Sequence, residues 1–372
     1  MPRTFRGARL ALEVFSVLLA AVSLGCLAAP PQPLPALNID IKQTSVSGIS
    51  SGGFMSVQFQ IAHSSIIRGA GIVAGGPYYC SQNDVVTATT KCSCTGEPIL
   101  RCEVSPTSAK VPALVAATKS LFEAKLIDDP GNVANQRVVT LAGRKDPLVP
   151  EPVATQLTEY YTALGLPPQN VSAVSLDNAG HTMPTLAFGN ACSVTDEPYI
   201  GKCQFDSARA ILSWIYGPLR PPGSGKAKGR YIQFDQRPFI PNDGPFSYLW
   251  GSGLDSSGWI YVPDSCAKGA RCRLHIALHG CKQGQSYLPL RPPPGGGLYY
   301  GTTFVKNTGY ARWADNNKLA VLFPQAVSIP AKNPNGCWDW WGYTDQHYSD
   351  QKGVQIRALR AMVDRLSSGL PH

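Results

Sequence analysis

The sequence predicts an α/β fold in which a mostly parallel central sheet is covered by helices on both faces. First, patterns typical of strands and helices alternate between residues 37 and 216, as they do where helices join parallel strands. Second, a turn rich in glycine and serine lies between the first predicted strand and the first predicted helix. Third, four further strand patterns follow residue 229 and would extend the same sheet.

The elements before residue 217 follow from hydrophobic periodicity. β-Branched residues stand among polar ones in the first strand, and helical spacing begins after the serine-containing turn. A cysteine-rich segment over residues 80–102 interrupts the alternation. In chain order we expect strands at 37–46, 71–75, 137–141 and 171–176, and helices at 54–62, 111–126, 155–164 and 207–216.

The remainder of the chain begins with an internal linker. Proline and glycine crowd residues 217–229, a composition typical of loops. Beyond it, apolar and aromatic runs predict strands at 231–234, 258–262, 274–278 and 319–323.

The N-terminal residues 1–29 have the layout of a cleaved secretory signal peptide. Three arginines precede an apolar run over residues 10–24, and small residues close it at Ala28 and Ala29. The run is too short to indicate a membrane span, and no other stretch approaches the necessary length. We therefore expect a secreted, extracellular protein that is soluble, monomeric and without a membrane partner.

Charge and cysteine content agree with export. The net charge of +9 comes from scattered Lys and Arg residues, so we expect no nucleic-acid partner. Of the 11 cysteines, Cys26 falls in the signal peptide and ten remain, which predicts up to five disulfides. A zinc site at Cys80, Cys92, Cys94 and Cys102 is the competing interpretation, although their spacing differs from paired zinc motifs.

Ser50 is the predicted nucleophile. Gly48-Ile49-Ser50-Ser51-Gly52 fits the pattern GxSxG, and a predicted strand precedes it while a predicted helix follows. This context is typical of the α/β-hydrolase nucleophile turn, where glycines leave room for a tight backbone. A serine in an ordinary turn is the alternative. A serine hydroxyl also needs a general base, so the prediction depends on suitable partners.

His181 and Asp146 are the predicted partners of Ser50. Both lie in loops after predicted strands, and the order Ser50, Asp146, His181 is that of α/β-hydrolases. Asp177 and Asp129 are the rival acids, and Asp177 is better explained as a turn residue. Among the other histidines, structural roles are expected for His63, His275 and His372, while His347 is left unassigned.

The oxyanion hole and the strand count together predict a circular permutation. One backbone N–H should come from Ser51, and a second from a His–Gly loop, found here at 278–281. In α/β-hydrolases this loop and several strands precede the nucleophile, whereas here they follow it. We therefore expect residues 30–372 to form a single catalytic domain in which the 217–229 linker joins the permuted halves.

With these residues placed, the sequence resembles extracellular polyhydroxybutyrate depolymerases, especially the single-domain, circularly permuted type. The matching stretches are 48–53, 180–182, 278–281 and 335–341. The resemblance implies a Ser50–His181–Asp146 triad and an oxyanion hole formed by the N–H groups of Ser51 and Cys281. It also implies that Trp338 lines a substrate subsite and that Cys281 and Cys337 form a disulfide.

These observations predict a serine esterase that cleaves a polyester or oligoester by acyl transfer and requires no metal or cofactor. A feruloyl or acetylxylan esterase on the same scaffold is the first alternative. The second alternative is a disulfide-rich binding protein without catalytic activity. The three tryptophans at 338, 340 and 341 fit an apolar cleft wall, and some of them fit the core instead.

Overall fold

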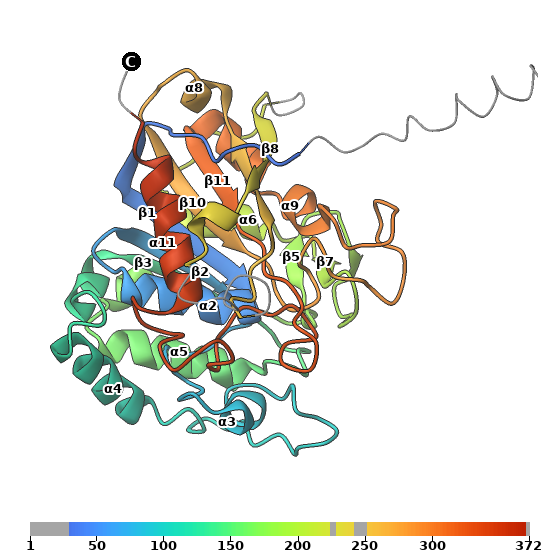
Figure 1. Cartoon of the computed structure of the whole chain (residues 1–372). Helices are drawn as coiled ribbons and strands as arrows, with labels where there is room; N and C mark the ends of the chain where they lie inside the picture. The colour runs from blue at the N-terminus through green and yellow to red at the C-terminus, as the bar shows by residue number, and fades with distance from the viewer. Residues whose placement is uncertain (1–29, 224–227, 242–250, 370–372) are drawn as a thin grey trace, which may run out of the picture.

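The computed structural model describes residues 30–223, 228–241 and 251–369. The predicted signal peptide therefore lies outside the described residues, as do residues 224–227 of the predicted linker. The described chain builds an eight-stranded sheet covered by helices, with a three-stranded sheet of β5 (Met183–Thr185), β6 (Asn190–Ala191) and β7 (Ile200–Lys202) at its side (Figure 1).

The eight-stranded sheet confirms the predicted mostly parallel arrangement. Neighbouring strands are parallel from β4 to β11, whereas β9 runs antiparallel to both β11 and β8. The order from edge to edge is β4 (Val171–Leu176), β3 (Arg137–Gly143), β2 (Ile67–Val73), β1 (Ile39–Ile49), β10 (Cys272–Leu278), β11 (Leu319–Phe323), β9 (Ser257–Val262) and β8 (Arg230–Asp235). Both halves of the sequence thus contribute strands to one sheet.

The two halves meet at β1 and β10. These strands are parallel neighbours, with Ser47 opposite Ala277 and Gly48 opposite Leu278. The described ends of the chain also meet, because the Leu37 N–H donates to the Leu366 carbonyl and the Gly369 N–H donates to the Leu37 carbonyl. Adjacent ends and a shared sheet are what the predicted permutation requires.

Helices cover both faces of the sheet because side chains alternate along its strands. On β1, Ser45 and Ser47 point toward α6 (Ser207–Tyr216) and α10 (Tyr310–Ala314), where their hydroxyls bond Tyr216 and Tyr310. The opposite face carries α2 (Ser51–Ala62) and α11 (Val354–Leu366), which pack together (Figure 1). Further helices and 3-10 turns are α3 (Val85–Thr90), α4 (Val111–Glu123), α5 (Glu151–Ala163), α8 (Asp264–Ala267), α9 (Thr303–Asn307), η1 (Pro130–Asn135), η2 (Pro168–Asn170), η3 (Arg237–Phe239) and η4 (Asp315–Asn317).

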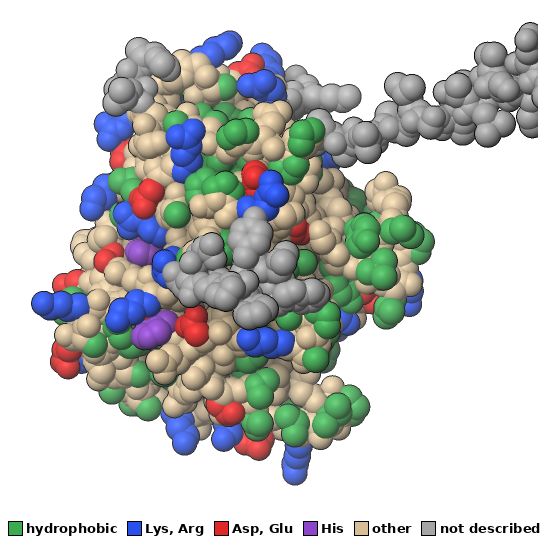
Figure 2. All heavy atoms as spheres, viewed as in Figure 1, with side chains coloured by type: hydrophobic (Ala, Val, Ile, Leu, Met, Phe, Trp, Pro, Cys, Tyr) green, Lys and Arg blue, Asp and Glu red, His purple; other side chains and the backbone are tan. Residues whose placement is uncertain are grey.

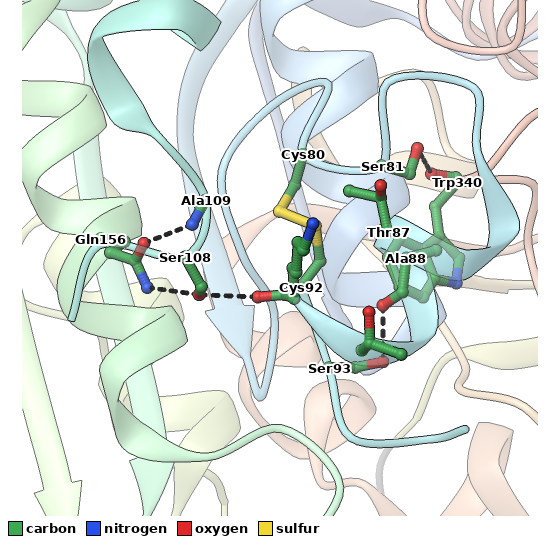
Figure 3. The surroundings of a disulfide bond; sticks show 12 residues. Cys80, Ser81, Thr87, Ala88, Cys92, Ser93, Ser108, Ala109, Gln156 and Trp340 are labelled. Carbon is green, nitrogen blue, oxygen red and sulfur yellow. Dashed lines mark hydrogen bonds between the residues drawn. A yellow bond between two sulfur atoms is a disulfide. The ribbon is translucent and has the colours of Figure 1, made fainter. Parts of the chain in front are cut away.

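Disulfides fasten the loops. The ten cysteines beyond the predicted signal peptide form five bonds, as predicted: Cys80–Cys92, Cys94–Cys102, Cys192–Cys203, Cys266–Cys272 and Cys281–Cys337. The four cysteines that were considered for zinc are therefore paired in two disulfides. Around Cys80–Cys92, the Ser81 hydroxyl donates to the Trp340 carbonyl and the Ser93 hydroxyl to the Ala88 carbonyl, which ties this segment to a distant loop (Figure 3).

The turn between β1 and α2 explains the glycines of the GxSxG pattern. Ser50 has φ 57° and ψ −124°, a positive φ that L-residues seldom adopt outside constrained turns. A Cβ added at Gly48 would lie 2.3 Å from the Gly52 carbonyl oxygen. One added at Gly52 would lie 2.3 Å from the His279 carbonyl oxygen and 2.5 Å from that of Leu278. Only glycine lets the turn approach the chain that leaves β10.

Gly52→Ala should therefore disrupt this turn. Because the new methyl group would meet backbone oxygens rather than a flexible side chain, we expect a loss of roughly 1–3 kcal/mol in the free energy of unfolding. Gly295→Ala is the matched control, since its Cβ would meet no atom within 4 Å. Urea titration of both variants measures the difference, and equal stability would contradict the proposed close approach.

Three buried histidines make stability depend on pH. Burial lowers the pKa of His63 and His279 to about 4 and that of His275 to about 3, with Arg360 also lowering the pKa of His63. The unfolded chain titrates near 6.5, so it binds more protons than the folded protein below that pH. The stabilisation is therefore complete above pH 6.5 and is lost as the pH falls toward 4.

Between pH 6.5 and pH 5 we expect each of these histidines to reduce the free energy of unfolding by about 1.6 kcal/mol. His63→Phe offers a direct test, because neither ring nitrogen of His63 has a hydrogen-bond partner in the described chain. In urea titrations with the disulfides intact, the free energy of unfolding of the variant should change less between pH 6.5 and pH 5, by about the contribution of one histidine. An unchanged pH dependence would show that His63 does not remain neutral in the folded state.

Candidate active site

A cavity of about 450 Å³ opens where the parallel strands end. Ser50, His181 and Cys281 all line it, although they come from the loops after β1, β4 and β10. Parallel strands deliver such loops to one edge of a sheet, so the register of β1 against β10 sets their proximity. A Cβ added at Gly280 would lie 3.3 Å from Ser50 Cβ, which shows how closely the His–Gly loop approaches the serine.

His181 and Asp146 form a buried pair beside this cavity. His181 Nδ1 lies 2.8 Å from Asp146 Oδ2, and both side chains are almost fully excluded from solvent. The other carboxylate oxygen, Oδ1, accepts the N–H groups of Leu148 and Val149, each at 2.8 Å. These bonds fix the orientation of the carboxylate, and the carboxylate in turn fixes the imidazole.

The rival acids lie elsewhere. Asp177 is exposed and pairs with Arg144 at 2.8 Å, at the end of the edge strand β4. Asp129 caps the 3-10 turn η1 by accepting the N–H of Gly131. Both carboxylates therefore have local structural roles, and the geometry favours Asp146 as the partner of His181.

Ser50 faces the cavity with an unengaged hydroxyl. Within the described residues, neither Ser50 Oγ nor His181 Nε2 makes a hydrogen bond, although both residues line the same cavity. The backbone N–H of His181 donates to Thr195 Oγ1 at 2.8 Å, which further fixes the position of the loop. A serine, a histidine and a carboxylate in this arrangement can perform acyl transfer, and their hydrogen bonds are often looser without substrate.

Two backbone N–H groups remain available near Ser50. Ser51 is the first residue of α2, so its N–H has no acceptor within the helix. In the His–Gly loop, the N–H groups of Gly280, Lys282 and Gln283 donate to Gln283 Oε1, Asn335 O and Gly280 O, respectively. The Cys281 N–H donates to no acceptor in the described chain. These are the two donors that the resemblance implies for an oxyanion hole.

The Cys281–Cys337 disulfide confirms the pairing implied by the resemblance and fastens the His–Gly loop to the tryptophan-containing segment. The resemblance also implies that Trp338 lines a substrate subsite. Its side chain is fully buried and does not line the cavity, because it packs behind the loop with its ring 5.5 Å from that of His279. The backbone N–H of Trp338 donates to Ser51 Oγ at 3.3 Å.

The aromatic wall of the cavity comes instead from the next two tryptophans. Trp340 and Trp341 line the cavity, and the Trp340 ring stacks on Phe54 with centroids 4.0 Å apart. The cavity lining also includes Val85 and Thr89 of α3, which were not expected near the site. In the sequence, the clustered tryptophans indicated an apolar wall of the cavity, whereas no motif indicated that α3 would line it.

The other histidines are not part of the cavity lining within the described ranges. His275 lies in the core, where its two ring nitrogens bond the hydroxyls of Ser45 and Ser47. His63 is also buried, which agrees with the structural role expected for both. His347 pairs with Asp350 at 2.7 Å, and His372 lies outside the described residues.

Comparisons with known proteins confirm the resemblance. No family model matches the chain. The poly(3-hydroxybutyrate) depolymerase of Delftia acidovorans is 40% identical over 340 residues, which cover 90% of this chain. The chain spans only 62% of the length of that relative. The polyhydroxybutyrate depolymerase of Talaromyces funiculosus is 35% identical over 363 residues, with 94% of this chain and 96% of the relative covered.

Solved structures agree over the whole fold. The crystal structure of a PHB depolymerase from Penicillium funiculosum has a TM-score of 0.77 at 34% identity. A PHB depolymerase complexed with an R3HB trimer has the same TM-score at 33% identity. Each match covers 91% of this chain and 100% of the solved chain. With near-complete coverage in sequence and in structure, this chain belongs to the polyhydroxybutyrate depolymerase family.

Proposed function

We propose that this protein is a secreted serine esterase that hydrolyses poly(3-hydroxybutyrate) or its oligomers. The observation that carries the proposal is the convergence of Ser50, the His181–Asp146 pair and the Cys281 amide on one cavity. Family membership supports the ester substrate, since the relatives described above are named for depolymerising this polyester.

In the proposed reaction, Ser50 Oγ attacks the ester carbonyl while His181 Nε2 accepts the hydroxyl proton. The carbonyl oxygen becomes an oxyanion that accepts hydrogen bonds from the N–H groups of Ser51 and Cys281. His181 then protonates the departing alkoxide and leaves an acyl group on Ser50. Water, deprotonated by His181, releases the acid and regenerates the serine. Asp146 holds the imidazole throughout, and the cycle needs no cofactor.

The cavity walls and the surface suit a water-insoluble polyester. Trp340, Trp341 and Phe54 provide an apolar wall for methyl and methylene groups. Outside the cavity, Leu288, Leu290 and Leu298 are 62%, 88% and 74% exposed. Figure 2 shows apolar side chains gathered at the right edge of the molecule, where the segment before α9 projects in Figure 1. Such a surface can adsorb to a solid apolar substrate.

Export and domain organisation are part of the same proposal. Five disulfides are typical of proteins that mature in an oxidising compartment. Within the described part of the chain, no helix combines the length and apolar character needed to span a membrane. We propose that residues 1–29 are a signal peptide and that residues 30–372 form one permuted α/β-hydrolase domain acting as a monomer.

Clearing of a poly(3-hydroxybutyrate) suspension tests the reaction and its substrate. The wild-type protein should clear the suspension, and Ser50→Ala should reduce turnover of a chromogenic ester by about 10⁴-fold or more. The control Ser368→Ala, at an exposed serine far along the chain, should retain wild-type activity.

Release of ferulate or acetate from plant polysaccharide without clearing would favour the esterase alternative. Absence of fluorophosphonate labelling at Ser50 would favour a binding protein.

Asp146→Asn should inactivate the enzyme by changing the imidazole tautomer. Since Asp146 Oδ1 accepts two backbone N–H groups, the amide oxygen of Asn should occupy that side and its NH₂ should face His181 Nδ1. The ring proton would then reside on Nε2, which could no longer accept the Ser50 proton. We expect kcat to fall by about 10³- to 10⁴-fold. Asp177→Asn is the control, and comparable losses in both variants would contradict the assignment.

A further inference from the structure

His279 occupies a buried position directly behind the loop that carries the Cys281 amide. Its side chain is fully buried between aromatic neighbours, with ring centroids 5.5 Å from Trp338 and 6.3 Å from Phe304. It does not line the cavity, so it has no direct access to a bound ester. Both ring nitrogens nevertheless have defined partners: Nδ1 lies 2.7 Å from the Gly280 carbonyl oxygen and Nε2 lies 3.0 Å from the Ala326 nitrogen.

These two contacts determine the tautomer. The Ala326 backbone nitrogen can only donate, so Nε2 must accept and cannot carry a proton. Burial lowers the pKa of His279 to about 4, so the ring is neutral at ordinary pH and has a single proton. That proton is therefore on Nδ1, which donates it to the Gly280 carbonyl oxygen.

The Gly280 carbonyl belongs to the same peptide unit as the Cys281 N–H. A trans peptide is planar, and its C=O and N–H bonds point in opposite directions. Holding the carbonyl against the buried imidazole therefore turns the Cys281 N–H toward the other side, where Cys281 lines the cavity beside Ser50. The adjoining amides are already engaged, because Gly280 N–H donates to Gln283 Oε1 and Lys282 N–H donates to Asn335 O.

We infer that His279 is a positioning residue, which orients the Gly280–Cys281 peptide so that the Cys281 N–H can bind the oxyanion of the transition state. The inference rests on the proposed esterase function. The Cys281–Cys337 disulfide restrains the side chain of Cys281, but a side-chain bond leaves the peptide plane free to rotate. His279 restrains that rotation through the shorter of the two hydrogen bonds to the Gly280 carbonyl, at 2.7 Å, while the Gln283 N–H donates to the same oxygen at 3.3 Å. Preorganised donors of this kind act mainly in the transition state and affect substrate binding little.

Two substitutions separate the two hydrogen bonds of His279. His279→Asn places an NH₂ near the position of Nδ1 and can still donate to the Gly280 carbonyl. His279→Gln places an oxygen near the position of Nε2, so it can accept from the Ala326 N–H but cannot donate to the Gly280 carbonyl. On a chromogenic ester, we expect His279→Gln to lower kcat by about 10- to 100-fold with KM changed less than about threefold. His279→Asn should stay within about fivefold of the wild-type kcat.

A boronic acid forms a tetrahedral adduct with an active serine. Its inhibition constant Ki is measured on the folded enzyme, so a merely less stable variant would not change it. Its Ki should rise in His279→Gln by about the factor by which kcat/KM falls. His275→Phe is the matched control, because it removes another fully buried, doubly hydrogen-bonded imidazole and should lower the unfolding midpoint while kcat and Ki are retained. Equal losses of kcat in the Asn and Gln variants, or an unchanged Ki, would overturn the inference.

The tautomer can be measured in the wild-type protein without any substitution. The ¹⁵N shifts of the His279 ring should show a protonated Nδ1 and an unprotonated Nε2 from pH 5.5 to pH 8. The opposite tautomer, or a wild-type kcat in His279→Gln, would overturn the role of His279 even in an active esterase. A wild-type protein without esterase activity would overturn the proposed function instead, so the two failures are distinguishable.

Discussion

The parallel pairing of β1 with β10 is the constraint on which the site depends. Gly48 lies opposite Leu278, so the chain leaves both strands at the same level of the sheet. Ser50 comes two residues after Gly48, just past β1, and Cys281 comes three residues after Leu278, just past β10. A shift of register by one residue would exchange the faces of the strand and separate these groups. The absence of side chains at Gly48 and Gly52 allows this approach, since a Cβ at either position would overlap backbone oxygens.

A disulfide and hydrogen bonds hold the loops around this strand pair in place. The disulfide between Cys281 and Cys337 joins the His–Gly loop to the segment that supplies Trp340 and Trp341. The backbone N–H of Trp338 donates to Ser51 Oγ, so the same segment also contacts the start of α2. The Ser81 hydroxyl donates to the Trp340 carbonyl beside the Cys80–Cys92 bond, so the cysteine-rich segment contacts the same tryptophan-containing segment (Figure 3). The cavity is therefore bounded by covalently restrained loops on a rigid sheet.

The sequence predicted the positions that depend on local pattern. Ser50, Asp146 and His181 each follow a predicted strand, and parallel strands bring such positions to one edge of the sheet. The shared sheet could also be predicted, because the His–Gly loop and four strand patterns follow residue 229 rather than precede the nucleophile strand. Trp338 could not be placed, since residues 335–341 lie outside helices and strands, where no periodicity decides which side chain faces inward. The contribution of α3 to the cavity depends on how the disulfide-bonded segment 80–102 folds against the rest of the chain. The spacing of its cysteines in the sequence does not reveal this. Disulfide partners such as Cys192 and Cys203 required the three-dimensional arrangement as well.

The most direct test of the account is a crystal structure of the protein inactivated by an alkyl phosphonate ester. A phosphonylated serine resembles the tetrahedral intermediate, so its non-ester oxygen should mark where the oxyanion binds. The account predicts phosphorus bonded to Ser50 Oγ, and one phosphonyl oxygen within about 3 Å of both the Ser51 and Cys281 nitrogens. An adduct on another residue, or an oxygen directed away from the Cys281 amide, would contradict it.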